Sequence, residues 1–210
     1  MALGLDKRAG LRRGTILRDM VAPYRKRGAS LADLESVAEN MVGELLGGEL
    51  IVSPRPAFPH SVTTSTLGFA IGAPFQAGRG GPGGWWIVFE PELRLGPDVV
   101  VPDLAGWRRE RMPTRPESTG VTLAPDWICE VLSPSTASID RGKKRAIYLR
   151  EKVRHLWLVD PLARTLEVFE RGDGNWILLC THADEARVRT PPFEAVELDL
   201  LELWGETRSG

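Results

Sequence analysis

Cysteine is scarce in this chain of 210 residues, which contains only two. Cys129 and Cys180 both lie within apolar runs, and no other cysteine stands at the short, regular spacing that a zinc site requires. A small scaffold held together by disulfides would also need more of them. We therefore expect two reduced, buried thiols and a cytoplasmic protein.

Long apolar runs are absent as well. No stretch is long and apolar enough to span a membrane, and charged residues interrupt every apolar stretch in the first 20 residues. A signal peptide needs an uninterrupted apolar segment. The sequence predicts a protein that is neither secreted nor embedded in a membrane.

Neither sign of charge is in excess. The 27 basic and 28 acidic residues give a formal charge of -1, so the chain as a whole does not attract nucleic acid, and any such contact must be a local patch. Hydrophobic residues make up 42% and charged residues 26%, which is typical of a globular protein of one domain at this length.

The first 29 residues differ from the rest in charge. They contain two acidic residues, Asp6 and Asp19, and these basic ones: Lys7, Arg8, Arg12, Arg13, Arg18, Arg25, Lys26 and Arg27. Such a segment can bind nucleic acid as an arm, but it is more often solvated and partly disordered. We predict a flexible basic extension over residues 1 to 29 and one domain over residues 30 to 206.

The rest of the chain alternates between helical and extended patterns. Ser30 and Asp33 have the spacing of a helix N-cap and start a predicted helix over 31 to 41, while Gly47 and Gly48 form the turn of a hairpin. The further elements expected are a helix from 60 to 74, strands over 85 to 90, 91 to 95, 98 to 107 and 126 to 132, a helix over 139 to 152, a strand over 155 to 160, and a hairpin of 165 to 170 with 176 to 180. This order predicts an α/β or α+β fold with a mixed sheet.

The glycine-rich run RGGPGGWW, residues 79 to 86, has two interpretations. Loops of this composition can cradle phosphate, but this one lacks a Gly-Lys-Ser/Thr ending and does not open a helix. A turn before the strand that starts at residue 85 is the favoured interpretation.

Two acidic residues lie at or inside apolar runs. Asp103 follows the run 99 to 102, and Glu130 lies within the run 128 to 132. Side chains alternate between the faces of a strand, so adjacent strands can bring both carboxylates to one point. Like charges held close repel each other unless a cation lies between them. We therefore expect a hard divalent ion between the two acids, bound by both carboxylates and by the carbonyl of Val131.

The helix after Glu130 adds a lysine. Asp140, Lys144 and Tyr148 are spaced i, i+4 and i+8 and so share one stripe of the helix. If this stripe faces the sheet, Lys144 reaches the two carboxylates and Asp140 orients it. Metal-dependent phosphodiester cleavage needs these groups: the ion activates water and polarises the phosphate, and the ammonium stabilises phosphate charge or holds the nucleophile.

Each feature taken alone also has a structural interpretation. An aspartate after Pro102 is a common turn residue, an Asp-Lys pair at i, i+4 is common on helices, and Glu130 could point to solvent from an edge strand. The order of the three features along the chain favours the functional interpretation.

The motifs VVVPDLAGW, EVLSPST, DRGKKRAIY and HLWLVDP closely resemble the Uma family of predicted restriction endonucleases, within the PD-(D/E)XK nuclease superfamily. GELLGGELIVSP with His60, and VELDLLELW, resemble the family's two terminal elements, so the resemblance covers residues 40 to 204. It implies a restriction-endonuclease-like mixed β-sheet flanked by helices. It also implies a homodimeric nuclease that depends on magnesium or manganese and acts on DNA.

One position departs from the general superfamily pattern, in which the lysine stands two residues after the acid. That position is Leu132 here, and in the Uma-type pattern the lysine is displaced to the next helix, so the role passes to Lys144. The resemblance further implies that Glu44 assists the metal and His60 the phosphate. A hairpin glutamate and a histidine at a helix start also have ordinary structural interpretations.

Three functions remain open at this point. A metal-dependent endonuclease would use a local cationic rim, for which the sequence offers Arg108, Arg109, Arg111, Arg115, Arg141, Lys143 and Arg145. A binding or regulatory protein would keep the nuclease fold without turnover, which the near-neutral charge allows. An enzyme acting on a small phosphorylated substrate would share the metal site but need a closed pocket.

Overall fold

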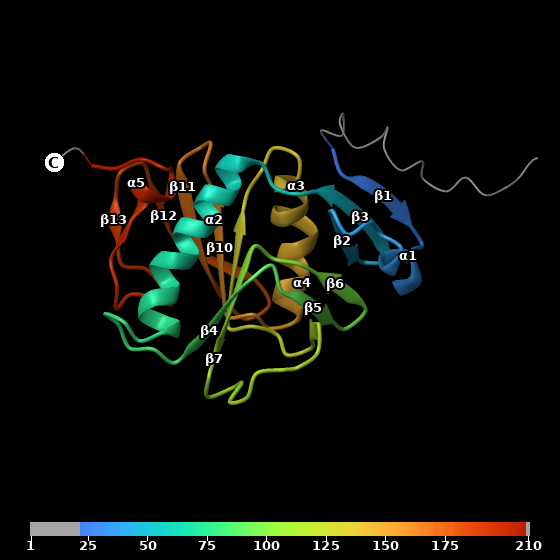
Figure 1. The fold of residues 1–210 in the computed structure, drawn as a ribbon, viewed down its shortest axis with the longest axis horizontal. Helices are drawn as coiled ribbons and strands as arrows, with labels where there is room; N and C mark the ends of the chain where they lie inside the picture. Colours follow the sequence, from blue (N-terminus) through green and yellow to red (C-terminus); the bar gives the residue numbers. More distant parts are fainter. Residues whose placement is uncertain (1–21, 209–210) are drawn as a thin grey trace, which may run out of the picture.

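The computed structural model describes residues 22 to 208, which form two six-stranded sheets, a two-stranded sheet and several short helices (Figure 1). The first sheet has the spatial order β1 (Tyr24–Arg27), β3 (Glu49–Pro54), β2 (Met41–Leu46), β6 (Asp98–Val100), β5 (Glu92–Leu95) and β8 (Gly120–Val121). The second has the order β12 (Trp176–Ala183), β11 (Thr165–Arg171), β10 (His155–Asp160), β9 (Trp127–Val131), β7 (Leu104–Arg108) and β4 (Trp85–Phe89). Strands β13 (Arg187–Val188) and β14 (Leu198–Asp199) pair separately.

Helices cover the second sheet on both faces. They are α2 (Phe58–Ile71), its continuation η1 (Gly72–Gln76), the consecutive segments α3 (Ala137–Ile139), η2 (Asp140–Lys144) and α4 (Arg145–Arg150), and α5 (Leu200–Leu203). Helix α1 (Leu31–Glu35) lies against β2 of the first sheet instead. Both large sheets are mixed, because β5 and β8 pair in parallel in one and β9 and β10 in the other. The expected α+β fold with a mixed sheet is therefore confirmed.

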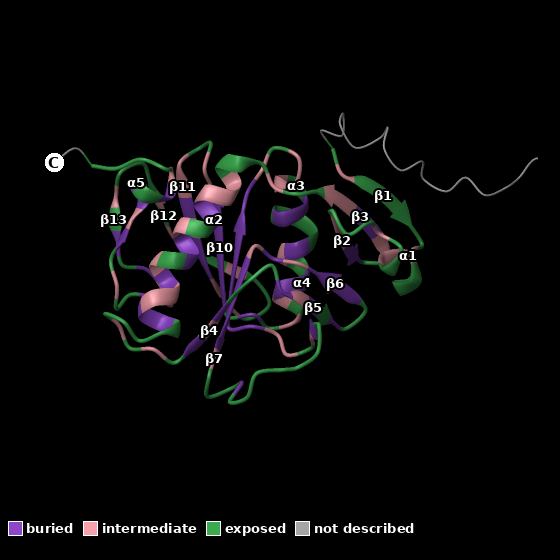
Figure 2. Cartoon of the chain, viewed as in Figure 1, coloured by how far each residue is buried: buried purple, intermediate pink, exposed green. Residues whose placement is uncertain are grey.

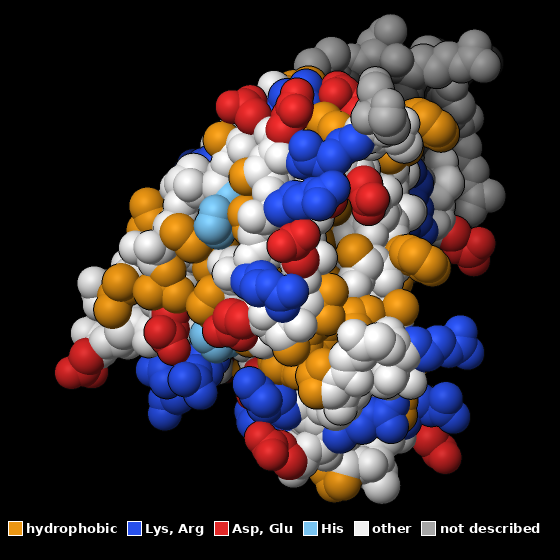
Figure 3. All heavy atoms as spheres, turned by 90° about the vertical axis from the view of Figure 1, so that its left-hand side faces the viewer, with side chains coloured by type: hydrophobic (Ala, Val, Ile, Leu, Met, Phe, Trp, Pro, Cys, Tyr) orange, Lys and Arg blue, Asp and Glu red, His pale blue; other side chains and the backbone are white. Residues whose placement is uncertain are grey.

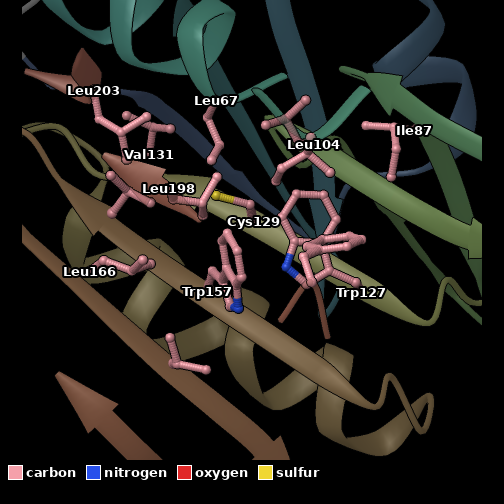
Figure 4. Packing of buried hydrophobic residues seen from close by; sticks show 14 of the residues in the cluster. Leu67, Ile87, Leu104, Trp127, Cys129, Val131, Trp157, Leu166, Leu198 and Leu203 are labelled. Atoms are coloured by element: carbon pink, nitrogen blue, oxygen red, sulfur yellow. The ribbon is translucent and has the colours of Figure 1, made fainter. Parts of the chain in front are cut away.

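Two hydrophobic clusters lie on opposite faces of the second sheet. On one face, α2 and the C-terminal segment pack around Trp127 and Trp157, whose rings meet edge to face at 5.3 Å (Figure 4). On the other face, the α3 to α4 helix and the first sheet pack against residues such as Ile128 and Leu156. Strand β9 is buried over its whole length, as Figure 2 shows for the centre of the molecule.

The hairpin turn is confirmed at Gly47 and Gly48. Their φ angles are +62° and +72°, a region that L-residues other than glycine rarely adopt, and β2 and β3 pair antiparallel on either side. The N-cap of α1 is also confirmed, because Ser30 and Asp33 form a reciprocal capping box. The glycine-rich run is followed by β4 and opens no helix, as its favoured interpretation requires.

Several predicted boundaries are wrong. Helix α1 ends at Glu35 and not at residue 41, because Met41 starts β2 and its neighbours complete the hairpin. The predicted strand 98 to 107 is two strands in different sheets, with Val101 to Asp103 as the connection. Here the proline at 102 removes a ladder hydrogen bond and ends the first strand.

The basic extension also needs a correction. Residues 24 to 27 form strand β1, paired antiparallel with β3. All four residues are exposed, so their sequence carries no alternation of apolar and polar side chains that would have indicated a strand. Residues 1 to 21 of the predicted extension lie outside the described residues.

Two further expectations concern thiols and membranes. Both cysteines are free, with Cys129 buried as predicted and Cys180 only half-buried. Burial raises the pKa of the Cys129 thiol well above its usual value. No helix within residues 22 to 208 combines the length and apolar character needed to cross a membrane.

Candidate active site

Glu130 lies in the middle of buried strand β9 and has only 1% of its surface exposed. Its neighbours Ile128 and Leu132 point to the same face, toward the α3 to α4 helix, while Cys129 and Val131 point to the opposite face. Tyr148 on that helix donates its hydroxyl to Glu130 Oε1 at 2.5 Å. The helix thus provides partners for a carboxylate that would otherwise be buried alone.

Lys144 is the second partner of Glu130. Its Nζ lies 2.9 Å and 3.0 Å from the two carboxylate oxygens of Glu130, and it is itself only 4% exposed. The same Nζ lies 3.2 Å from Glu44 and 3.5 Å from Asp140, and it donates to the Val101 carbonyl at 3.1 Å. The helical stripe of Asp140, Lys144 and Tyr148 therefore faces the sheet, and one ammonium is shared by three carboxylates.

Asp103 lies just before strand β7, which pairs antiparallel with β9. The pairing of Leu104 with Cys129, continued by one residue, brings Asp103 opposite Glu130. Asp103 accepts a hydrogen bond from the Val131 N–H at 2.7 Å, and its other oxygen lies 3.2 Å from His60 Nε2. His60 comes from the first turn of α2. Both acids line the same cavity, although Asp103 is held by α2 and Glu130 by the α3 to α4 helix, which cover opposite faces of the second sheet.

Glu44 connects the first sheet to this cluster. It lies in β2, is 7% exposed, and accepts the N–H of Val101 at 2.8 Å in addition to contacting Lys144. The sequence singled out Glu44 only through the family resemblance. In the structure, Glu44 extends from the hairpin and contacts the segment that connects β6 to β7.

Burial and the neighbouring charges shift the pKa values of the cluster. Burial, together with the neighbouring carboxylates, raises the pKa of Glu130 well above its usual value and that of Asp140 to about 6. Burial also opposes the charge of Lys144, but Glu130 and Glu44 outweigh it and raise the pKa of the ammonium. The neighbouring acids thus hold Lys144 in its charged form, while burial and mutual repulsion oppose the charge of Glu130 and Asp140.

The neighbouring carboxylates also raise the pKa values of His60 and Tyr148. Burial lowers the pKa of His60, but the Asp103 carboxylate outweighs it, so the net shift is upward. Burial and the charge of Glu130 raise the pKa of Tyr148 well above its usual value, which keeps its hydroxyl proton available for Glu130. Both residues act as hydrogen-bond donors to the acids they contact.

A cavity of about 350 Å³ opens onto the cluster. Its wall comes from the hairpin, the start of α2 and the loop after β9, and it includes Glu44, His60, Asp103, Glu130, Val131, Asp140 and Lys144. The sequence patterns did not indicate the outer part of this wall. Arg55, paired with Glu90 at 3.0 Å, and the polar loop of residues 133 to 136 lie there, and neither segment has a periodic pattern.

The donor atoms suit a hard divalent cation. The acids are oxygen ligands, and the repulsion among them, which contributes to the raised pKa of Glu130, favours a cation in the cavity. Within residues 22 to 208, however, no three His, Cys, Asp or Glu side chains stand in a ready-made metal arrangement. Asp103 is held by His60 and Val131, and Glu130 by Lys144 and Tyr148. These partners would have to share the carboxylates with an ion.

The arginines expected to form a cationic rim mostly have other partners. Arg108 and Arg109 stack over Trp85 and Trp86 at 4.6 Å and 4.0 Å, and Arg111 pairs with Asp126 at 2.8 Å. The following pairs occupy the second predicted cluster: Arg141 with Glu167, Lys143 with Glu49, and Arg145 over the ring of Phe169. These side chains are engaged within the protein, so they are weaker candidates for contacts with nucleic acid than cations without such partners.

Comparison with known proteins agrees with the resemblance in the sequence. Residues 32 to 201 match the family model Uma2, described as "Putative restriction endonuclease". A crystal structure from Anabaena variabilis, described as a "putative nuclease belonging to DUF820", is similar with a TM-score of 0.68 and 23% identity, over 84% of this chain and 98% of that one. No curated protein matches the chain. Because the family model covers most of its length, the chain belongs to the Uma2 family.

Proposed function

We propose that this protein is a metal-dependent endonuclease that hydrolyses phosphodiester bonds in DNA. The observation that carries the proposal is the meeting of Asp103, Glu130 and Lys144, from two strands and one helix, at one cavity. A carboxylate pair beside a buried ammonium is an expensive arrangement for stability alone, and such arrangements concentrate at functional sites. Membership of the Uma2 family supports the same reaction class.

Each residue has a proposed role. Asp103, Glu130 and the Val131 carbonyl would hold Mg²⁺ or Mn²⁺, with Glu44 assisting. When bound, the ion would polarise the phosphate and activate water for attack. Lys144 stabilises the charge on the phosphate oxygens or positions the nucleophile.

The remaining residues position these groups. Asp140 and Tyr148 fix the ammonium and the Glu130 carboxylate, respectively, through the contacts described above. His60, held between Asp103 and the Thr64 hydroxyl, is placed to donate to a phosphate oxygen. Such side-chain support keeps reacting groups within a narrow range of positions.

Metal binding tests the site directly. Titrating Mg²⁺ or Mn²⁺ to about 100 times the dissociation constant should raise the unfolding free energy by about 3 kcal/mol. Asp103→Asn should abolish this gain, because it removes one of the two ligand carboxylates, whereas the exposed Asp173→Asn should retain it. Thermal or urea unfolding with and without the metal measures the gain. An equal gain in the Asp103 variant would contradict the site.

Assays on plasmid, single-stranded DNA and RNA separate the alternatives. A non-catalytic binding or regulatory protein would bind without cleaving any of them. An enzyme for a small phosphorylated substrate is favoured by one observation, the cavity volume of about 350 Å³, which lies in the range of small-molecule sites. It would cleave phosphomonoesters or small diesters and leave the polymers intact.

We further propose a homodimer formed through β12. This strand is an edge of the second sheet, contains no charged residue, and exposes Ile177, Leu178 and Leu179 by 48%, 50% and 41%. Hydrophobic side chains, interspersed with charged ones, lie on this side of the molecule in Figure 3. Two copies paired antiparallel along β12 would extend the sheet without placing like charges opposite each other.

Sedimentation or light scattering over a range of concentrations measures this association. The double variant Leu178→Lys and Leu179→Lys should be monomeric, because charges on an edge strand prevent pairing. The control Leu162→Lys, which alters another exposed leucine, should behave like the parent. A parent protein that stays monomeric at all concentrations refutes the dimer.

A further inference from the structure

The cavity is acidic, which raises the question of how a polyanion could approach it. Five carboxylates line it, and Lys144 is engaged with three of them. Phosphates are therefore repelled unless cations outside the cavity hold the backbone. The predicted arginine rims are mostly engaged in stacking and ion pairs. The phosphate-binding cations must be sought elsewhere on the surface around the cavity.

Strand β1, with the sequence YRKR, is the candidate. It is the outer edge of the first sheet, all four residues are exposed, and it lies at one end of the molecule, outside β3 and β2 (Figures 1 and 2). Lys26 is paired with Asp33 at 2.5 Å. Arg25 and Arg27 appear in none of the ion pairs found among residues 22 to 208.

The register of the sheet aligns Arg25 with the active site. Arg25 is opposite Ile51 on β3, and Ile51 is opposite Glu44 on β2. Residues directly opposite in an antiparallel sheet point to the same face, so Arg25 shares the face from which Glu44 reaches Lys144. Two strand spacings place the two Cα atoms about 10 Å apart.

Arg27 lies in the next row of the same face. It is opposite Glu49, whose carboxylate also meets Lys143 on the helix. Lys143, Arg25 and Arg27 together lower the pKa of Glu49, and the hydrogen bond from Lys143 is the largest cause. Three cations around one carboxylate leave an excess of positive charge at this end of the hairpin.

We propose that Arg25 and Arg27 on β1 form the strip that binds the phosphate backbone of the nucleic-acid substrate. This inference rests on the proposed nuclease function and names the surface that the substrate would use. Alternate residues of a strand are about 7 Å apart, close to the rise of two nucleotides along one strand of a duplex. The two guanidinium groups can therefore contact phosphates of one strand while the chain enters the cavity.

Binding of a labelled DNA duplex in metal-free buffer tests the strip. The double variant Arg25→Glu and Arg27→Glu should bind at least about tenfold more weakly at 0.1 M salt, and its salt slope should be smaller by about 2. The milder pair Arg25→Gln and Arg27→Gln should show a smaller loss in the same direction. Because Arg27 lies opposite Glu49, the charge-reversal variant should unfold at a slightly lower temperature than the parent, whereas the glutamine pair should unfold close to the parental temperature.

The matched control is Arg154→Glu with Arg171→Glu, at the far end of β10 and β11, which changes the net charge equally. It should leave binding close to that of the parent. If both charge-reversal variants lose DNA affinity equally, or if the β1 variant loses none, the proposed role of Arg25 and Arg27 is refuted. The proposed nuclease function would remain. A parent protein that neither binds nor cleaves nucleic acid would refute the proposed function, and the strip would fail with it.

Discussion

Replacing Lys144 by methionine is expected to lower the unfolding free energy by about 3 to 5 kcal/mol at pH 8, because it leaves buried carboxylates without their cation. Glu130, Glu44 and Asp140 all lie within 3.5 Å of the ammonium that the variant removes. Cleavage of DNA should also be abolished. Urea unfolding and plasmid cleavage measure the two effects.

The loss of stability should shrink as the pH falls. The pKa of Asp140 is raised from 3.8 to about 6 and that of Glu130 well above its usual value, with burial as the main cause. A carboxyl with a raised folded pKa stabilises the protein below its unfolded pKa, and this contribution disappears as pH rises through the folded pKa. Without Lys144 both pKa values rise further, so the variant should recover much of its stability by pH 5.

Lys143→Met is the matched control for this prediction. Its side chain is 43% exposed and pairs with Glu49 at the surface, where an ion pair contributes about 0 to 1 kcal/mol. Its loss of stability should be small and nearly independent of pH. If the two variants lose equal stability, Lys144 does not neutralise the cluster.

Replacing Glu130 by glutamine should have the opposite effect on stability. The amide keeps the shape of the side chain and can still accept the Tyr148 hydroxyl, while the ionised carboxylate no longer has to be buried. Lys144 keeps Glu44 and Asp140 as partners. We expect an unfolding free energy at pH 8 that is unchanged or higher, and a cleavage rate at least about 100-fold lower.

Cleavage rates and urea unfolding of the parent and the Glu130 variant, compared at one pH, measure these two effects. The control Glu170→Gln, at a partly exposed position of β11 that pairs with Arg154, should change neither quantity appreciably. A Glu130 variant that cleaves at the parental rate would remove the carboxylate from the proposed chemistry. A variant that fails to fold would show that Glu130 holds the structure together instead.

The arrangement of Glu130, Lys144 and Tyr148 could be anticipated because it depends on local periodicity. A strand fixes which face Glu130 takes, and helical spacing puts Lys144 and Tyr148 on one stripe. Glu44 could be linked to the site only through a family resemblance. Its contact with Lys144 crosses from the hairpin to a helix about 100 residues later, and no local pattern records such a contact.

The fold was anticipated in its elements more than in their arrangement. Alternation identified most strands, but it could not reveal that residues 98 to 100 and 104 to 108 belong to different sheets, because both halves are apolar and buried. Strand β1 was missed for the opposite reason: every residue in it is exposed, and its pairing with β3 supplies the regular structure. The stacking of Arg108 and Arg109 on tryptophan could not be anticipated either, because sequence spacing does not show which arginines stack.

The connection between β6 and β7 has a consequence for how much variation the chain tolerates. Only Val101, Pro102 and Asp103 separate the last residue of one sheet from the first residue of the other. Deleting or inserting one residue there would leave both cores intact, yet it would turn the aspartate away from Glu130. The length of this crossing is therefore as strict a requirement for the chemistry as the identity of the acids themselves.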